Sequence, residues 1–135
     1  HAGSVSLGLS LEGRNRTICI DGDGSLLMHM GSQLTIAINA NKKFKYILLN
    51  NNSHESVGGQ STLANGINFK KLVKSVGYKK YFKINDKKNL KANLKKFLNS
   101  KGPAFLEVII SKGSIKNLSR PKNLILIKKN FMKKK

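Results

Sequence analysis

The stretch Asp21-Gly22-Asp23-Gly24-Ser25 decides the fold because it joins two segments with different apolar patterns. Before it, residues 17–20 form a short apolar run that is typical of a buried strand. After it, residues 26–40 carry apolar side chains at helical spacing, and we expect one helix with Ser25 as its N-cap. A strand, a glycine turn and a helix in this order place backbone N–H groups at the carboxyl edge of a sheet, where a phosphate binds well.

A second polar stretch, Leu49-Asn50-Asn51-Asn52-Ser53-His54, follows the next predicted strand, residues 46–50. Because the carboxyl ends of parallel strands share one edge of a sheet, we expect this stretch to lie beside the first. Asp23 alone would repel a phosphate, but a divalent cation between the two groups makes them compatible. Asn50 and Asn51 add neutral oxygen ligands, so the pattern favours a Mg²⁺ site.

The remaining periodicities extend the alternation of strands and helices. The predicted strands are residues 78–84, near an edge of the sheet, and residues 104–110. The predicted helices are residues 2–11, residues 67–76, and a segment capped by Asp86 that carries a stripe of Leu90, Leu94, Phe97 and Leu98. Residues 124–127 fit a strand or a helix. The order predicts a doubly wound α/β domain with a mostly parallel sheet and helices on both faces.

Length and composition indicate one folded domain over residues 1–135, since 39% of the residues are hydrophobic. No apolar run approaches the length of a membrane span. The single cysteine, Cys19, lies in an apolar strand, so we expect a buried thiol and a reducing, cytoplasmic location.

The net charge of +20 raises the alternative of a basic nucleic-acid-binding module. However, only Arg14, Arg16 and Arg120 are arginines among the 26 basic residues, whereas nucleic-acid readers favour arginine for bidentate contacts. We therefore expect no nucleic-acid partner, and interpret the charge as a compositional bias that also attracts anionic ligands.

Several motifs together carry a resemblance to a known family. Gly22-Asp23-Gly24, followed after residues 25–49 by Asn50-Asn51, is similar to the thiamine diphosphate signature. Together with His1-Ala2-Gly3-Ser4, the segment from His54 to Gln60, and the ending Asn117-Leu118-Ser119-Arg120-Pro121, it resembles the C-terminal pyrophosphate-binding domain of phosphonopyruvate decarboxylases. The resemblance covers essentially the whole chain, and it implies an N-terminally truncated piece of a larger enzyme.

The resemblance implies a set of ligands for Mg²⁺ and thiamine diphosphate. The metal ligands are the side chains of Asp23 and Asn51 and the backbone carbonyl of Ser53. The other cofactor-binding residues are His1, Gly22, Gly24, Ser25 and His54. Asn52 departs from the family pattern, which often has a small residue such as glycine there, and this could alter the path of the loop that carries Ser53.

The resemblance also implies partners. The substrate is a small anionic 2-keto acid, the enzyme is a homo-oligomer without a membrane segment, and the glutamate that activates the cofactor lies on a separate pyrimidine-binding domain or subunit. Glu12, Glu55 and Glu107 do not match that glutamate. An alternative within the class is sulfopyruvate decarboxylase, in which the pyrophosphate domain can be a separate beta-type subunit.

Overall fold

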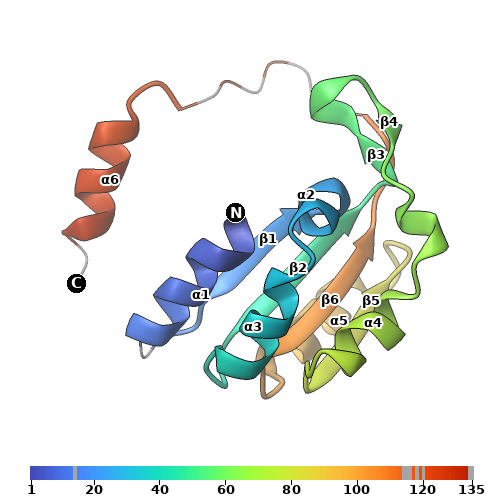
Figure 1. Ribbon diagram of the computed structural model, residues 1–135, viewed down its shortest axis with the longest axis horizontal. Helices are drawn as coiled ribbons and strands as arrows, with labels where there is room; N and C mark the ends of the chain where they lie inside the picture. The colour runs from blue at the N-terminus through green and yellow to red at the C-terminus, as the bar shows by residue number, and fades with distance from the viewer. Residues whose placement is uncertain (14, 114–116, 118, 120, 134–135) are drawn as a thin grey trace.

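The computed structural model describes residues 1–13, 15–113, 117, 119 and 121–133. Its main sheet is four-stranded and parallel, with the order β1-β2-β6-β5 (Figure 1). These strands are β1 (Ile18–Gly22), β2 (Lys45–Asn50), β5 (Lys80–Ile84) and β6 (Ala104–Ile109). The parallel order confirms the predicted α/β class, and β5 is an edge strand as its interleaved lysines predicted.

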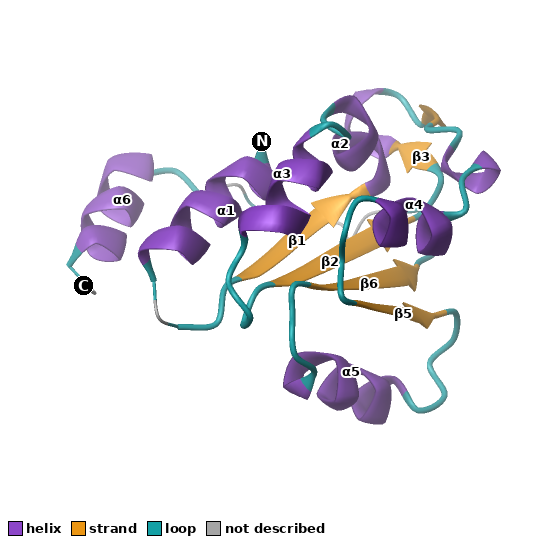
Figure 2. Cartoon of the chain, turned by 60° about the horizontal axis from the view of Figure 1, so that its bottom comes forward, coloured by secondary structure: helices purple, strands orange, loops and turns teal. Residues whose placement is uncertain are grey.

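Helices cover both faces of this sheet, as Figure 2 shows. The helices α1, α2, α3 and α4 lie on one face, and α5 lies on the other. Their bounds are α1 (Ala2–Glu12), α2 (Asp23–Met28), α3 (Ser32–Asn39), α4 (Phe69–Ser75) and α5 (Leu90–Asn99). A small hairpin, β3 (Ser53–His54) and β4 (Gln60–Ser61), follows β2, with the 3-10 helices Glu55–Val57 and Ala64–Gly66 in the same region.

Each face of the sheet has its own apolar core. On the face with four helices, the Tyr46 and Phe105 rings stack 5.1 Å apart, and Cys19 is buried as predicted. On the α5 face, Phe97 packs against Phe82 with ring centroids 5.6 Å apart. The central strands β2 and β6 are covered on both faces, which explains their near-continuous apolar runs, whereas the edge strand β1 exposes Ile18 and Ile20.

The prediction of a single helix over residues 26–40 is wrong, because the segment forms two helices, α2 and α3. His29, with φ −126° and ψ 35°, leaves the helical conformation and ends α2. The N–H of Ser32 then donates to the carbonyl of His29, which starts the next turn. Ser25 therefore lies inside α2, and Gly22 occupies the N-cap position.

The cap predicted for the next helix is also wrong. The N-cap of α5 is Asn89 in a left-handed conformation with φ 58°, and not Asp86. The predicted stripe on this helix is graded: Phe97 is fully buried, Leu94 and Leu98 are partly buried, and Leu90 is 40% exposed.

The C-terminal segment ends in a helix, α6 (Leu124–Met132), which settles the strand-or-helix alternative for residues 124–127. Figure 1 shows α6 apart from the sheet and its helices. Arg14, Leu118 and Arg120, which entered the sequence arguments, lie outside the described residues. In the ranges that the structure describes, no helix is long and apolar enough to span a membrane.

Candidate functional site

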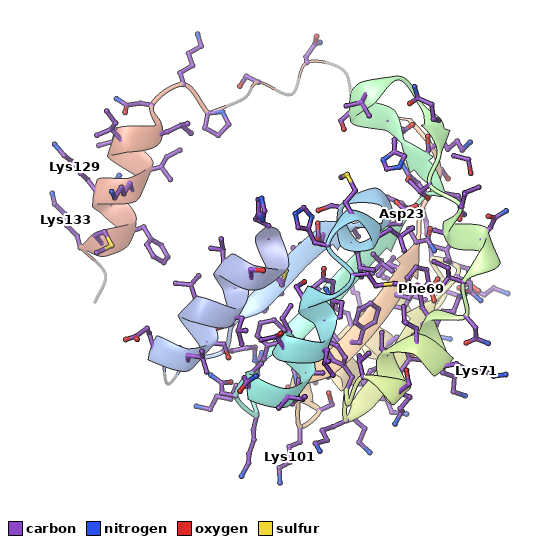
Figure 3. All side chains as sticks on the ribbon, in the orientation of Figure 1. Asp23, Phe69, Lys71, Lys101, Lys129 and Lys133 are labelled. Atoms are coloured by element: carbon purple, nitrogen blue, oxygen red, sulfur yellow. The ribbon has the colours of Figure 1, made fainter. Side chains whose placement is uncertain are left out.

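The turn from β1 into α2 places a buried carboxylate at the carboxyl edge of the sheet. Asp23 is the first residue of α2 and is only 2% exposed (Figure 3). One of its carboxylate oxygens, Oδ2, accepts a hydrogen bond from the hydroxyl of Thr62. Among the described residues, no basic side chain forms an ion pair with Asp23. A buried carboxylate without a cationic partner is costly, so this position suits a bound cation.

The end of β2 places the predicted amide ligand opposite Asp23. The Oδ1 atom of Asn51 accepts the N–H of Ser53 at 3.0 Å, and its Nδ2 atom donates to Glu55 at 2.9 Å. An amide oxygen has a second lone pair, so Asn51 can still ligate a metal. Ser53 itself is 7% exposed, at the start of the β3–β4 hairpin.

The backbone conformation at Asn52 is one that suits an asparagine. Asn52 adopts a left-handed conformation with φ 56°. Glycine adopts this conformation freely, and asparagine is among the few other residues that tolerate it. The residue present is therefore compatible with the turn that leads to Ser53.

The His54 side chain closes over the glycine turn. A Cβ atom added to Gly24 would lie 2.4 Å from Nδ1 of His54 and 3.2 Å from Cγ2 of Thr62. Only a glycine fits at this point without moving its neighbours. The hairpin that carries His54 turns through Gly58 and Gly59, whose φ angles of 119° and 80° also require glycine.

A cavity of about 590 Å³ brings these segments together. Seven of the eight site residues that the resemblance implied line it: Gly22, Asp23, Gly24, Ser25, Asn51, Ser53 and His54. The eighth, His1, does not line the cavity, and its ring instead contacts His29 edge-on with centroids 4.3 Å apart. Asn50, which the strand pattern added as an oxygen ligand, does not line the cavity either and is bonded to Glu107 and Asn52.

Sequence reasoning missed other residues of the site. The cavity is also lined by the apolar side chains of Met28, Leu49, Val57 and Ile110. Thr62, the donor to Asp23, was missed as well. Ile110 follows β6, so only the strand order could have placed it beside β2.

The oxygen atoms available as metal ligands suit a hard cation that also binds a phosphate. The described residues contain no cluster of three histidine, cysteine or acidic side chains that could hold a metal alone. What the site offers is one carboxylate, one amide oxygen and the backbone of the Ser53 loop, all oxygen donors. Mg²⁺ prefers such a partial set, with the remaining positions filled by phosphate and water.

Comparison with known proteins identifies the family to which a chain with this fold and cavity belongs. Residues 1–108 match the family model of the thiamine pyrophosphate enzyme C-terminal TPP binding domain, and the chain belongs to this family. This confirms the cofactor family that the glycine turn and the paired asparagines predicted.

Particular relatives of the chain are named as decarboxylases. The chain is 32% identical to phosphonopyruvate decarboxylase of Streptomyces viridochromogenes over 90% of its length, which is 30% of that relative. It is 31% identical to the beta subunit of sulfopyruvate decarboxylase of Methanothermobacter thermautotrophicus, over 84% of this chain and 58% of the relative. The corresponding subunit of Methanococcus maripaludis is 33% identical, over 96% of this chain and 69% of the relative.

Proposed function

We propose that this chain is the thiamine diphosphate- and Mg²⁺-binding part of a 2-keto acid decarboxylase. The observation that carries the proposal is the single cavity that gathers the glycine turn, Asp23, Asn51 and the Ser53 loop at one edge of the sheet. The family match supports the cofactor, and the names of the relatives support the reaction class.

Each part of the cavity has a distinct task in this proposal. The backbone N–H groups at Gly24 and Ser25 donate to the diphosphate. Asp23, Asn51 and the Ser53 carbonyl hold the Mg²⁺ that neutralises it. The bound cofactor supplies an acceptor for the electron pair that is released when CO₂ leaves the 2-keto acid.

The cavity walls serve the same reaction by holding the cofactor and limiting water. His54 lies against Gly24 and fixes one side of the turn. The apolar side chains of Met28, Leu49, Val57 and Ile110 line the cavity beside it, and Met28 and Val57 are 69% and 68% exposed. A bound cofactor would cover this apolar surface, and the exclusion of water would then strengthen the electrostatic interactions within the site.

The substrate that we propose is phosphonopyruvate, a 2-keto acid with a second anionic group. The support is the segment from His54 to Gln60, which resembles the decarboxylases of this substrate and whose residues His54, Ser56, Val57 and Gln60 line the cavity. A second candidate is sulfopyruvate, because several relatives at comparable identity are sulfopyruvate decarboxylase beta subunits. Both substrates present the same chemistry, an anionic group on the carbon next to the keto group.

Competition between the two substrates tests the assignment. The complete enzyme, supplied with Mg²⁺ and thiamine diphosphate, is assayed for CO₂ release from each 2-keto acid alone and from mixtures. We expect a higher kcat/KM for phosphonopyruvate, with sulfopyruvate as a weak competitor. The reverse order would assign the enzyme to sulfopyruvate, and turnover of neither acid would contradict the proposed function.

We also propose that the active enzyme contains a pyrimidine-binding part, fused or separate, and is an oligomer. Relatives named as beta subunits support a partner subunit. The glutamates near the cavity do not replace that part: Glu55 is bonded to Asn51, and Glu107 is buried in β6 away from the cavity lining.

A further inference from the structure

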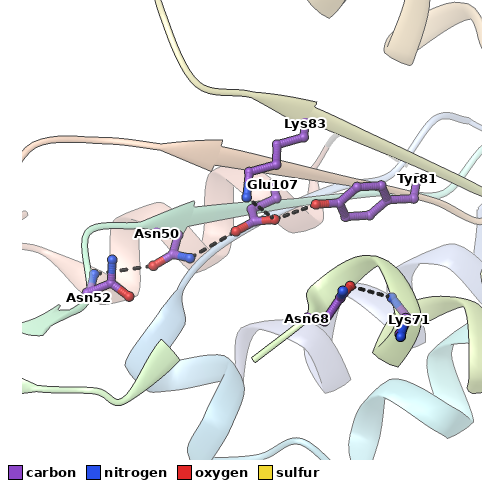
Figure 4. Close-up of polar contacts among 7 residues, drawn as sticks. All are labelled: Asn50, Asn52, Asn68, Lys71, Tyr81, Lys83 and Glu107. Atoms are coloured by element: carbon purple, nitrogen blue, oxygen red, sulfur yellow. Dashed lines mark hydrogen bonds and ion pairs between the residues drawn. The ribbon is translucent and has the colours of Figure 1, made fainter. Parts of the chain in front are cut away.

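A buried carboxylate outside the cavity, that of Glu107, is connected by hydrogen bonds to the loop that carries Asn51 and Ser53. Glu107 lies in β6, is 3% exposed, and borders a different hollow between β5 and α4. Figure 4 shows its side chain among Asn50, Tyr81 and Lys83. Glu107 does not line the cavity, so the cavity does not account for its burial. The contacts of its carboxylate do.

The described polar contacts of the Glu107 carboxylate all come from donor groups. Oε2 accepts from the hydroxyl of Tyr81 and lies 3.3 Å from Nζ of Lys83. Oε1 accepts from Nδ2 of Asn50 at 3.0 Å. Burial and the adjacent carboxylate raise the pKa of Tyr81 above its ordinary value, so its hydroxyl keeps the proton that it donates.

The carboxylate thereby fixes the orientation of the Asn50 amide. A carboxylate only accepts hydrogen bonds, so the NH₂ group of Asn50 must face Glu107. The Oδ1 atom of Asn50 then faces the other way, where it accepts the backbone N–H of Asn52 at 3.2 Å. With the amide reversed, two donors would face each other at Asn52.

Asn52 connects the proposed ligands of the β2–β3 loop, Asn51 and Ser53, with the third ligand, Asp23. It lies between Asn51 and Ser53, two of the proposed metal ligands, and its backbone is held in the left-handed conformation. Its carbonyl accepts the N–H of Thr62 at 3.4 Å, and Thr62 is the residue that donates to Asp23. The position of the Asn52 backbone therefore affects all three ligands.

We propose that Glu107 is a positioning residue for the Mg²⁺ site: through the Asn50 amide it orients the loop that presents Asn51 and Ser53. The inference rests on the proposed function of the cavity. It assigns to a buried strand residue a role that acts at the metal without contacting it. Partners of metal ligands that lie outside the coordination sphere commonly matter in this way.

The test is Glu107→Gln, with Tyr81→Phe as the matched control. The two donors that share Oε2, Tyr81 and the Lys83 ammonium, should hold the oxygen of an introduced glutamine. Its NH₂ group then faces Asn50, which turns the Asn50 amide and breaks its bond to Asn52. Tyr81→Phe also removes a hydrogen bond from the same carboxylate, but it leaves the contact to Asn50 intact. In the complete enzyme we expect Glu107→Gln to raise the Mg²⁺ concentration for half-maximal thiamine diphosphate binding by about 10- to 100-fold.

Two further readouts separate positioning from a general loss of stability. Hydrogen exchange of the segment 49–54, measured without cofactor, should be faster in Glu107→Gln than in wild type or Tyr81→Phe. Saturating Mg²⁺ should restore most of the kcat of Glu107→Gln, because the site is weakened and its chemistry is unchanged.

A double variant that exchanges the amide and the carboxylate should restore the hydrogen bond between positions 50 and 107. In the double variant Asn50→Asp with Glu107→Gln, the introduced amide donates to the introduced carboxylate, which keeps a second oxygen for the N–H of Asn52. We expect slow exchange of the segment 49–54 and tight Mg²⁺ binding to return, even if Glu107→Gln alone folds poorly.

Three results would overturn the inference: wild-type Mg²⁺ affinity in Glu107→Gln, equal losses in Tyr81→Phe and Glu107→Gln, or no recovery in the double variant. If wild type itself binds no thiamine diphosphate, the proposed function fails instead, and that result is distinct from these three.

Discussion

Two carboxylates on neighbouring positions of one turn have different surroundings. Asp21 accepts the hydroxyl of Tyr46 at 2.7 Å and the N–H of Gly22 at 3.0 Å, so its needs are met within the protein. Asp23 is more deeply buried and accepts one described hydrogen bond, from Thr62. The alternation along the strand end thus separates a structural aspartate from one that is free to bind a cation.

This difference predicts that replacing Asp23 and replacing Asp21 by asparagine will affect cofactor affinity differently. Asp23→Asn should weaken Mg²⁺-dependent thiamine diphosphate binding by more than about 100-fold, which exceeds the effect expected of a residue outside the coordination sphere. Asn51→Ala should act in the same direction. Asp21→Asn is the matched control, since it keeps one of the two acceptors that serve Tyr46 and Gly22 and should lose far less affinity than Asp23→Asn. Calorimetric titration measures all three, and equal affinities for Asp21→Asn and Asp23→Asn would contradict the ligand assignment.

The glycine turn permits a second test with an internal control. Gly24→Ala places a methyl group against His54 and Thr62, and we expect a loss of about 1–3 kcal/mol in the free energy of unfolding. Gly22→Ala meets no atom within 4 Å and should cost less. Urea denaturation followed by circular dichroism measures both. Adding His54→Ala to Gly24→Ala should recover part of the loss, and no recovery would place the clash elsewhere.

At the scale of elements, the sequence could predict the strands but not every helix boundary. The run at 46–50 lies in a central strand and is largely buried, and the run at 17–20 buries Cys19, so their apolar character marks both as strands, and their carboxyl ends place the motifs together. The break between α2 and α3 is different. His29 leaves the helix where the apolar spacing continues, because the chain must turn to lay α3 on the sheet. Periodicity alone contains no signal for such a turn.

The candidate site, too, could be predicted from the sequence only in part. Residues at strand ends could be assigned to the cavity from the sequence, because parallel strands share an edge. The connection from Glu107 through Asn50 to Asn52 could not, since it depends on β6 pairing directly with β2. His1 was placed in the site by resemblance alone, and in this structure it contacts His29 outside the cavity lining.

The single helix on the second face predicts an uneven sensitivity along α5. Phe97 is fully buried, packs against Phe82, and has Nζ of Lys45 5.8 Å from its ring centroid. Phe97→Ala should lower the free energy of unfolding by about 3–5 kcal/mol. Leu90→Ala, at the partly exposed start of the same helix, should cost much less. Urea midpoints compare the two, and similar losses would mean that α5 does not pack as described.

At the scale of the whole molecule, apolar surface remains uncovered. Ile18 and Ile20 of β1 are 44% and 60% exposed, on a strand whose other face is buried. The apolar residues of α6 are also exposed, among them Leu124 and Ile125. Exposed apolar surface of this kind is typical of interaction sites, and it agrees with our proposal that the active enzyme has further parts.

The shared metal predicts that the two ligands stabilise the protein together. Because Asp23 is paired with no cation among the described residues, thiamine diphosphate alone would bring negative charge toward a buried carboxylate. Mg²⁺ removes that repulsion. In a thermal melt of the complete protein, both ligands at about 100 times their Kd should add roughly 2.7 kcal/mol of stability. A shift from thiamine diphosphate that is as large in EDTA would rule out a shared metal.

The last prediction is that decarboxylation requires a second polypeptide segment. The chain offers a cavity for the diphosphate and metal, but its described glutamates near the site are engaged elsewhere: Glu55 with Asn51, and Glu107 with Asn50 and Tyr81. The resemblance implies that activation of the cofactor would need a carboxyl group to move a proton at its pyrimidine ring. The purified 135-residue chain should therefore release no CO₂ from phosphonopyruvate, even with saturating Mg²⁺ and thiamine diphosphate. Adding the pyrimidine-binding part, fused or separate, should give turnover. Full activity from this chain alone, abolished by Glu55→Gln, would instead make Glu55 the activating group and overturn the proposed division of the site.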